Sequence, residues 1–386
     1  MKNKRILIAS PFFPYPPSFG GIFDILGRIK ELKKLGYTLD LIYSDKKKPE
    51  PKDLEFLSKF INELYFVKRT NKLINLFSFK PLQVVSRKGL RFIDLKHNYD
   101  LLIIENDSAA EILSNPSLKA ENIVLRVQNN ESIYFQNLAN STINVFKKAY
   151  YYSESIKFKR HSSLLFNIVN RLWFISSDEY LKDKVINART KGIHLPSPIN
   201  LGNINRRSLD SNNVLFVGAL FMPNNLEAIE WYLKNIHKDV LKVFPKYKFI
   251  IAGSTGKYSK SYFDSKFSNI PAVEVYFDLD SLDFVYDKAS VFVNPMRHGA
   301  GVKIKSIHSM INGLPLVSTK TGSEGIGLTD GVNFLHGETK TEFINGVKAM
   351  LKDKPLREKI ALGGQAFLKE NNSEKILEDE LFTIFK

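Results

Sequence analysis

Short runs of apolar residues alternate with helical patterns along almost the whole chain. Continuous apolar runs are typical of strands that are covered on both faces, as in parallel sheets. Helical patterns such as Ile25–Leu35 and Leu226–Leu241 lie between the runs. This alternation predicts βαβ units and doubly wound α/β sheets. The runs predicted as strands are RILIA (5–9), LDLIY (39–43), DLLII (100–104), NIVLRV (122–127), LWFIS (172–176), VLFVG (214–218), KFIIAG (248–253), VEVYF (273–277), SVFVNP (290–295) and LPLVS (314–318).

The series of strands restarts after a segment rich in Pro, Asn, Ser and Gly, at residues 192–213. A chain of 386 residues also exceeds one ordinary hydrophobic core. We therefore predict two Rossmann-like domains that face each other across a cleft, because open α/β sheets bind ligands at the carboxyl ends of their strands. The predicted parts are an N-terminal domain (1–190), a linker (191–213), a second domain (214–370) and a C-terminal helix (371–386).

The composition is that of a soluble globular protein, with 44% hydrophobic and 25% charged residues. Cysteine is absent, which excludes disulfides and thiolate chemistry and favours the cytoplasm. The apolar run near the start is too short for a secretory signal, and Ile6 to Ala9 is interpreted as a strand. No apolar run approaches the ~18 residues that a membrane-spanning helix needs.

Positive charge is concentrated in the first half. The net charge is +16, and residues 1–200 carry 32 Lys and Arg against 19 Asp and Glu. In residues 201–386 the balance is 24 against 21. This asymmetry indicates an anionic partner for the first half, although a generally Lys-rich composition would also produce part of it.

One basic stretch mixes cations with apolar residues, and no acidic residue lies between Glu63 and Asp94. This pattern favours docking on an anionic membrane surface, where each cation contributes ~1 kcal/mol. A solvated basic loop is the alternative. Nucleic acid is not expected, because no helix-turn-helix, zinc-ligand or RNA-binding pattern is present. The residues chosen for membrane docking are Lys68, Arg69, Lys72, Phe77 and Lys80.

The strongest chemical motif is a glycine-rich turn between a predicted strand and a predicted helix. SVFVNP (290–295) is followed by RHGAG (297–301) and by VKIKSIHSMIN (302–312), which ends at Gly313. Such a turn directs backbone N–H groups at an anion. Lys303 and Lys305 lie where the helix dipole disfavours cations, which indicates a bound dianion. An ordinary strand–helix connection with solvated lysines is the alternative.

The run from Pro295 to Gly325 resembles the C-terminal signature of GT-B glycosyltransferases, in particular glycosyltransferase family 4 (group 1). That signature is a Gly-x-Gly-x-Lys-x-Lys loop followed by Glu-Ala-Met-Ala-x-Gly-x-Pro. Three further stretches resemble the family in the correct order: PFFPYPPSFGG (11–21), RVQNNESIYFQNLA (126–139) and FVGALFMPNNLEAIEWYL (216–233). The residues that match the signature are Gly299, Gly301, Lys303, Lys305, Met310, Gly313 and Pro315.

The resemblance implies a retaining glycosyltransferase whose donor is a nucleotide sugar and whose acceptor is a glycan or a lipid-linked sugar. It also implies that the C-terminal helix returns to the N-terminal domain. Lys303 and Gln128 are the catalytic candidates. The implied ligands of the donor diphosphate are Gly21, Gly299, Gly301, Lys303 and Lys305. Those of the nucleotide or sugar are Gly218, His298, His308 and Glu324.

The chain departs from the family at several positions. Two glutamates eight residues apart are replaced by Ala300 and His308. His308 is expected either to hydrogen-bond a ribose hydroxyl or to be a half-buried structural residue. Gln128 stands where a histidine is frequent, and it can orient a hydroxyl but cannot carry a proton at pH 7. His161 is interpreted as the replacement of a common glutamate.

No metal or other cofactor is expected. Asp278 and Asp280 have the spacing of a divalent-metal motif, but they follow a buried strand and precede a helix. Capping of that helix is therefore the predicted role.

The sequence thus favours a cytoplasmic glycosyltransferase, peripherally bound to the inner face of the plasma membrane, that helps to build a surface polysaccharide or glycolipid. Two alternatives stay open. One is a nucleotide-sugar epimerase or hydrolase, and the other is a non-catalytic relative that binds a partner.

Overall fold

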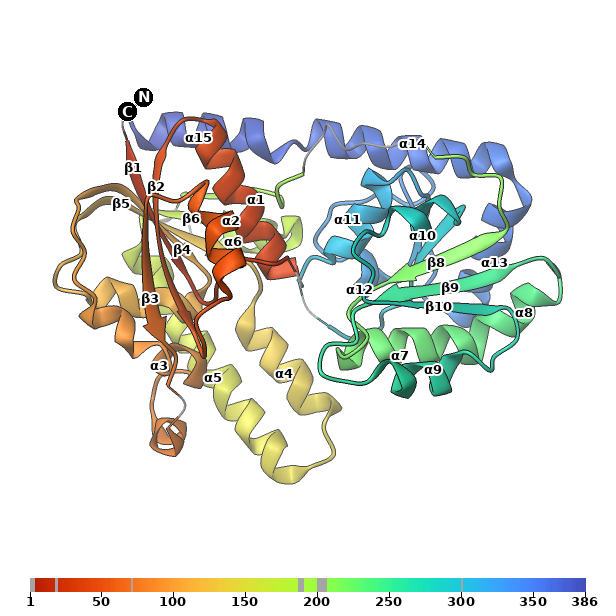
Figure 1. The fold of residues 1–386 in the computed structure, drawn as a ribbon, viewed down its shortest axis with the longest axis horizontal. Coiled ribbons are helices and arrows are strands. Elements are labelled where there is room, and N and C mark those ends of the chain that lie inside the picture. Colours follow the sequence, from red (N-terminus) through yellow and green to blue (C-terminus); the bar gives the residue numbers. More distant parts are fainter. Residues whose placement is uncertain (1–3, 18–19, 71, 187–190, 200–206, 300) are drawn as a thin grey trace. The chain divides into compact units, whose positions relative to one another are not determined.

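The chain forms two compact units, which are described separately (Figure 1). The computed structural model describes residues 4–17, 20–70, 72–186, 191–199, 207–299 and 301–386. The first unit comprises the described residues of Met1–Pro198, Ala300–Val302 and Ser373–Lys386, and the second those of Ile199–Gly299 and Lys303–Asn372.

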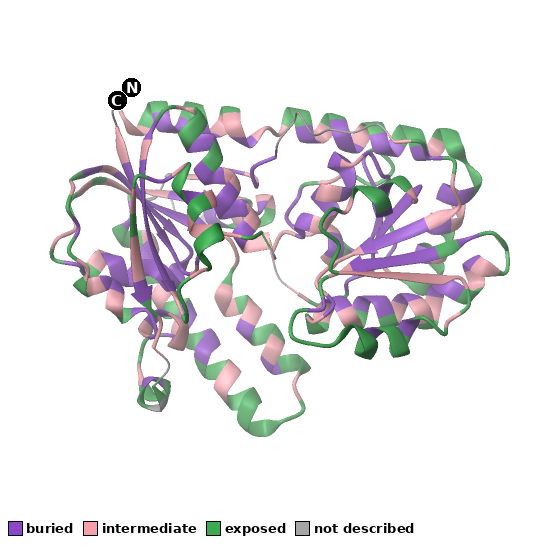
Figure 2. Ribbon diagram, viewed as in Figure 1, coloured by how far each residue is buried: buried purple, intermediate pink, exposed green. Residues whose placement is uncertain are grey.

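A seven-stranded parallel sheet forms the centre of the first unit, and its order reverses between β1 and β4. The strands β1, β2, β4 and β5 are apolar over most of their length because helices cover both faces, and Figure 2 shows them buried. In order across the sheet they are β3 (Glu63–Lys68), β2 (Thr38–Asp45), β1 (Arg5–Ser10), β4 (Tyr99–Glu105), β5 (Ala120–Val127), β6 (Arg171–Phe174) and β7 (Lys191–His194).

Helices of very different length surround this sheet. The consecutive helices α4 and α5 form an antiparallel hairpin that projects from the unit (Figure 1). The helices are α1 (Gly20–Lys34), α2 (Pro51–Ser58), η1 (Leu73–Phe77), α3 (Leu82–Val85), η2 (Lys88–Phe92), η3 (Asp107–Ser114), α4 (Glu131–Ser141), α5 (Val145–Ile168), α6 (Ser177–Ile186) and the C-terminal α15 (Ser373–Ile384).

Polar contacts join α15 to the first unit. The Ser373 hydroxyl donates to Glu31 at 2.6 Å, and the indole N–H of Trp173 donates to Glu380 at 3.3 Å. Leu377 and Leu381 are fully buried in the same core as β1 and β2. The last helix of the chain is therefore part of the unit that contains its beginning.

The second unit contains a six-stranded parallel sheet, whose order reverses between β8 and β11. Across the sheet the strands are β10 (Val273–Phe277), β9 (Lys248–Gly253), β8 (Asn213–Val217), β11 (Val291–Asn294), β12 (Leu316–Ser318) and β13 (Leu335–His336). The helices are α7 (Pro223–Tyr232), the π-helical turn η5 (Leu233–His237), α8 (Lys238–Leu241), α9 (Lys260–Phe267), α10 (Asp283–Asp287), α11 (Ile304–Ile311), α12 (Lys320–Ser323), α13 (Lys340–Lys352) and α14 (Lys354–Glu370).

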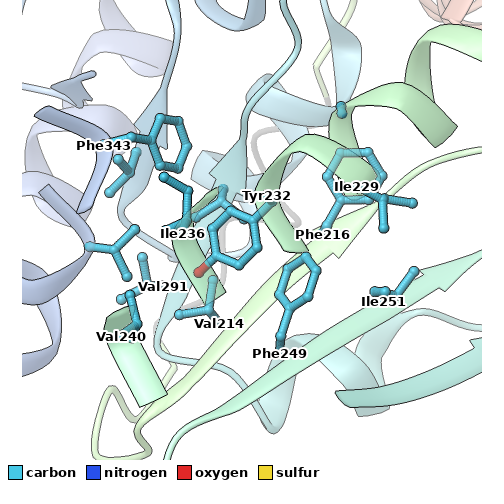
Figure 3. Packing of buried hydrophobic residues seen from close by; sticks show 14 of the residues in the cluster. Val214, Phe216, Ile229, Tyr232, Ile236, Val240, Phe249, Ile251, Val291 and Phe343 are labelled. Carbon is cyan, nitrogen blue, oxygen red and sulfur yellow. The ribbon is translucent and has the colours of Figure 1, made fainter. Parts of the chain in front are cut away.

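Aromatic and branched side chains fill one face of this second sheet (Figure 3). Tyr232 from α7 stacks on Phe249 from β9, with ring centroids 4.3 Å apart. The Tyr232 hydroxyl lies 3.0 Å from that of Tyr247, so the buried phenols satisfy each other. This core holds α7 and the strands rigidly beneath the loops at their carboxyl ends.

Each of the ten apolar runs predicted as strands overlaps a strand of the structure. The predicted fold class, with two parallel sheets, is confirmed. The prediction did not include β3, an edge strand that is only partly buried and whose apolar run, LYFV (64–67), is short. Within the segment interpreted as a linker (191–213), Lys191–His194 forms β7, the first unit runs to Pro198, and residues 200–206 lie outside the described residues.

Candidate functional site

The candidate site lies where the strand order of the second sheet reverses, which is the usual ligand position in such sheets. Strand β8 ends at Val217 and is followed by Gly218, and β11 ends at Asn294 and leads into the glycine-rich turn. Both loops lie at the carboxyl edge of the same sheet because the two strands are parallel. The predicted anion-binding turn is thus beside the first loop of the unit.

Backbone geometry explains the glycines of the turn. Gly299 has φ +141° and Gly301 has φ +73°, both in the region that strains residues with a Cβ. The residue between them, Ala300, lies outside the described residues. Lys303 has extended backbone angles and occupies the N-cap position of α11, without a side-chain cap. The Ser306 N–H donates to the Lys303 carbonyl at 2.9 Å, whereas the N–H groups of Ile304 and Lys305 form no hydrogen bond with any described residue and can point at an anion.

Lys305 is held at the centre of the site by groups from several elements. Its ammonium group donates to Oδ1 of Asn225, lies 3.6 Å from the sulfur of Met296, and is 4.6 Å from the ring centroid of Phe216. A Cβ on Gly218 would lie 3.1 Å from the same nitrogen, so a larger residue would crowd it. Burial, and next the neighbouring Lys303 cation, lower the pKa of Lys305 to about 7.

Lys303 and Glu324, both predicted from the sequence, come together. The Nζ of Lys303 lies 3.5 Å from Oε2 of Glu324, and the lysine side chain is 7% exposed while that of the glutamate is 43% exposed. The glutamate follows α12, whose Gly322 carbonyl accepts from Ser306 at 2.8 Å and from Asn294 at 3.0 Å. These buried bonds fix the segment that presents the carboxylate.

His308 lies one helical turn after Lys305 and is half-buried. Burial lowers its pKa to about 4, so the imidazole is neutral at pH 7. A neutral ring can donate or accept a hydrogen bond but adds no positive charge for a phosphate. The structure therefore favours hydrogen-bonding chemistry over charge at this position.

His298 occupies a more exposed position in the turn. Its Nδ1 lies 2.6 Å from Oε1 of Glu227 on α7, and the two side chains are 64% and 46% exposed. The pair joins the glycine-rich turn to the start of α7, near Asn225.

Gln128 and Gly21 belong to the first unit. Gly21 lies in the first turn of α1, and Gln128 follows β5 directly. The side-chain amide of Gln128 donates to Oε2 of Glu105 at 3.3 Å. Glu105 in turn belongs to a fully buried charged cluster with Asp24, Arg28 and Arg126. The cluster thus holds in place the Glu105 oxygen that accepts the hydrogen bond from the Gln128 amide.

Reasoning from the sequence missed Asn225 and Glu131. Asn225 stands in the quoted FMPNNLEA stretch, and its buried amide donates to the carbonyl of Ala219 at 2.9 Å, which turns its oxygen toward Lys305. Glu131 accepts from Asn106 at 3.2 Å, and burial raises its pKa to about 7. Both residues lie in stretches that were quoted as motifs, so their residue types were available signals. The sequence does not show the burial that gives Asn225 its contact with Lys305 and raises the pKa of Glu131.

The residues chosen for membrane docking differ in their surroundings. Lys68 and Lys72 are exposed, and Phe77 is 84% exposed. Lys80 forms an ion pair with Glu111 at 2.7 Å. Arg69 is half-buried and donates to the hydroxyl of Ser86 at 3.0 Å, so it faces the interior of its loop.

The predicted capping role of Asp278 is wrong. Its carboxylate accepts from the N–H and the hydroxyl of Thr255, both at 2.9 Å, and so ties together two loops at the carboxyl edge. Helix α10 begins at Asp283, and no side chain caps it. Among the described residues, no group of three or more His, Cys, Asp or Glu side chains could hold a metal ion. None of the described helices is both long and apolar enough to cross a membrane.

Comparisons of sequence identify relatives of the chain. Residues 211–353 match the family of glycosyl transferases group 1. An uncharacterized 44.6 kDa protein in the cps region of Klebsiella pneumoniae is 34% identical over 395 residues, which cover 98% of this chain and 99% of that protein.

Solved structures share the fold over the whole chain. A TarM mutant of S. aureus, in complex with fondaparinux, alpha-GlcNAc-glycerol and UDP, has a TM-score of 0.71 at 10% identity, covering 100% of both chains. Sucrose-phosphate synthase from Thermosynechococcus elongatus has 0.70 at 13%, covering 99% of this chain and 100% of that one. The pneumococcal O-GlcNAc transferase GtfA, in complex with UDP and GlcNAc, has 0.64 at 12%, covering 99% and 98%. These similarities confirm the GT-B architecture.

Proposed function

Since this chain belongs to the group 1 glycosyltransferases, we propose that it transfers a sugar from a nucleoside-diphosphate donor to a glycan or lipid-linked acceptor. The product would be part of a surface polysaccharide or glycolipid. The location of the Klebsiella pneumoniae relative in a cps region supports this role. UDP is the first nucleotide to test, since it is the one bound in the TarM and GtfA structures.

The convergence of Lys303, Lys305 and the start of α11 on one loop carries the proposal. In glycosyl transfer the bond between the anomeric carbon and the diphosphate breaks, and its electron pair passes to the departing oxygen. Two ammonium groups and free helix N–H groups stabilise the charge that develops there. We infer that these groups replace a divalent metal in this role.

The acceptor hydroxyl oxygen forms the new bond to the anomeric carbon. In a transfer with retention it approaches on the face from which the diphosphate departs, and a diphosphate oxygen takes its proton. Gln128, whose amide is anchored on Glu105, is proposed to orient a hydroxyl group. It does not carry the proton, because an amide does not titrate near neutral pH.

Glu324, His308 and His298 are proposed to bind the nucleotide or the sugar. Glu324 lies 3.5 Å from the ammonium group of Lys303 and balances part of its positive charge. A phosphate bound beside Lys303 would balance this charge in its place. The exposed carboxylate can then accept from a hydroxyl of the ligand. The neutral imidazole of His308 suits a ribose hydroxyl. His298 is tied to Glu227 and is proposed to contact the same ligand.

Release of nucleoside diphosphate tests this function directly. Purified protein is incubated with UDP-sugars, with and without membrane lipids that contain glycan acceptors. We expect release of UDP to depend on acceptor and to coincide with labelled glycolipid. Release without acceptor would identify a hydrolase, and a changed sugar without release would identify an epimerase. No turnover and no nucleotide binding would support the partner-binding alternative.

Peripheral binding at the inner face of the plasma membrane is part of the proposal. The segment after β3 contains three strongly exposed side chains, Ile74 (69%), Phe77 (84%) and Phe79 (95%). The tip of the α4–α5 hairpin contains three more apolar side chains that lie in solvent, Ile143, Val145 and Phe146. Both segments project from the same end of the first unit (Figure 1), and Lys157 of α5 donates to the carbonyl of Leu76 at 3.1 Å.

Replacing Phe77 and Phe79 with serine is expected to lower binding to anionic vesicles at least about tenfold. Full burial of one phenyl ring contributes roughly 1.5–3 kcal/mol, so partial insertion of two suffices. Co-sedimentation with vesicles of phosphatidylglycerol and phosphatidylethanolamine measures the change. Leu362→Ser, at a half-exposed apolar position on α14, is the control. Equal sedimentation of the double variant and the wild type would refute membrane docking by this segment.

A further inference from the structure

Two arginines of the first unit lie together at the carboxyl edge of its sheet. Arg69 follows β3 directly, and Arg87 lies in the turn between α3 and η2. The N–H of Thr70 donates to the Ser86 carbonyl at 2.9 Å, and Nε of Arg69 donates to the Ser86 hydroxyl at 3.0 Å. Nε of Arg87 donates to the carbonyl of Pro11, just beyond β1, at 2.9 Å. The pair is thus fixed near the strand-order reversal of this sheet.

One of these arginines is buried and the other half-buried, and neither has a carboxylate partner among the described residues. Arg87 is 4% exposed and Arg69 is half-buried. Within the described part of the chain, neither forms an ion pair with Asp or Glu. The fully buried Arg28 and Arg126 of the same unit behave differently, since both bind Asp24. An unpaired buried cation is costly, so the arrangement indicates a ligand that completes it.

Nearby carboxylates do not neutralise the pair. Asp45 accepts from the backbone N–H groups of Phe13 at 3.3 Å and Lys46 at 2.7 Å, one through each oxygen. Glu131 has a pKa raised to about 7 by burial, so it is only partly ionised at neutral pH. Burial, and next the field of Arg69, lower the pKa of Arg87 to about 9. Asp45 and Glu131 thus favour the charged form of Arg87 only from a distance, and no described carboxylate forms an ion pair with either arginine.

The guanidinium groups also retain unused donors. In Arg87, Nε and Nη1 are occupied by the carbonyls of Pro11 and Gln83. Its Nη2, and both terminal nitrogens of Arg69, form no hydrogen bond with any described residue, and none of the three is sealed from solvent. Three nitrogens that carry N–H groups can therefore reach a ligand. Planar guanidinium groups match the oxygens of phosphate or carboxylate.

We propose that Arg69 and Arg87 bind an anionic group of the acceptor, a phosphate or a carboxylate. This inference rests on the proposed glycosyl transfer, which needs an acceptor as well as a donor. The donor diphosphate already has its own cations, Lys303 and Lys305, in the second unit. Arg69 also begins the segment with the exposed Phe77 and Phe79, so an acceptor phosphate attached to a lipid would have its chain beside an apolar surface.

The test uses the full-length protein saturated with UDP, so that the lysine site is occupied. Geranyl phosphate and octyl glucuronide are the two anionic probes, and geraniol and octyl glucoside are their neutral counterparts. Isothermal titration calorimetry measures each affinity in the wild type and in the double variant Arg69→Gln, Arg87→Gln. Lys59→Gln is the control, because it removes one positive charge from an exposed position of the same unit that has no proposed role in binding.

We expect one anionic probe to bind the wild type at least about tenfold more tightly than its neutral counterpart. That preference should disappear in the double variant and persist in Lys59→Gln. Preference for geranyl phosphate assigns a phosphate-bearing acceptor, and preference for octyl glucuronide assigns a uronic acid. Equal affinity for charged and neutral probes in the wild type overturns the proposal. Wild-type protein that does not bind UDP contradicts the proposed function separately, and the probes are then compared without nucleotide.

Thermal unfolding separates ligand binding from a structural role. Arg87→Met removes the cation together with two hydrogen bonds to the carbonyls of Pro11 and Gln83, so the Tm of the unliganded variant falls whether or not a ligand binds here. If Arg87 serves a ligand, the rise in Tm that the bound anionic probe gives the wild type should be lost in this variant. An equal rise in both proteins would overturn the assignment of Arg87. Arg69→Gln alone, at a half-exposed position, then decides whether the probe preference involves this edge of the sheet.

Discussion

Lys303→Ala is expected to lower turnover by roughly 100- to 1,000-fold while the fold is retained, because it removes one cation from the departing diphosphate. Loss of a single preorganised donor typically costs ~3–4 kcal/mol of transition-state stabilisation. The alanine also leaves the Glu324 carboxylate beside the phosphate without its 3.5 Å partner. Initial rates of UDP release with acceptor, together with circular dichroism and the Tm, measure the effect.

Two variants make this result specific. Lys320→Ala removes an exposed lysine at the start of α12 and should leave the rate within about twofold of the wild type, as surface substitutions usually do. Lys303→Arg keeps the charge and should retain more activity than the alanine variant. If Lys303→Ala transfers sugar within threefold of the wild-type rate, at an unchanged Tm, the assignment of the lysine site is wrong.

Binding of UDP is expected to consume a proton at Lys305 above pH 7. In the free protein its pKa is about 7, so the amine is mostly neutral at pH 8. A bound diphosphate favours the ammonium form and raises that pKa, so binding then takes up close to one proton. The affinity for UDP should therefore fall by about tenfold per pH unit between pH 7 and pH 9. Below pH 7 this dependence disappears, because Lys305 is already protonated.

Calorimetry at pH 8, in buffers with different heats of ionisation, counts the protons taken up. The uptake should vanish in Lys305→Met, which cannot titrate, and the affinity of that variant should be low at every pH. In the unliganded protein the lowered pKa of Lys305 affects the folding stability, and its effect on stability changes with pH in the opposite direction to its effect on the affinity for UDP. Unfolded chains bind the proton more readily between pH 7 and 10.5, so the stability contributed by this group rises with pH across that window. Tight binding of UDP at pH 8 without proton uptake would contradict the role of Lys305.

Local signals were sufficient for the fold class, and they predicted a donor site at the glycine-rich turn. Buried strands such as β1 and β9 are visible in the sequence because a strand covered on both faces must be apolar throughout. The glycine-rich turn is visible because Gly299 and Gly301 adopt angles that only glycine adopts without strain. By contrast, β3 at the edge of its sheet is only partly buried and has an apolar run of just four residues, LYFV (64–67), and it was not among the predicted strands.

The partners of the site residues depend on contacts between distant parts of the chain. Asn225 meets Lys305 across 80 positions, and Glu324 meets Lys303 across 21. Asp278 was expected to cap the following helix, but tertiary structure places it against Thr255, 23 positions earlier. Residue types and spacing do not encode such pairs, because each results from the register of parallel strands that pair across long crossovers.

The sequence by itself determined that this protein has two parallel α/β sheets, and it predicted that a turn with two lysines in the second binds an anion. Only the tertiary structure decided the protonation of those groups and the position of the remaining charge. Burial beside Lys303 gives Lys305 a pKa of about 7, and burial keeps His308 neutral. Folding also brings Arg69 and Arg87 together with no ion-pair partner among the described residues. The physical reason is that desolvation and long-range Coulomb energy depend on the three-dimensional surroundings, which local sequence patterns do not specify.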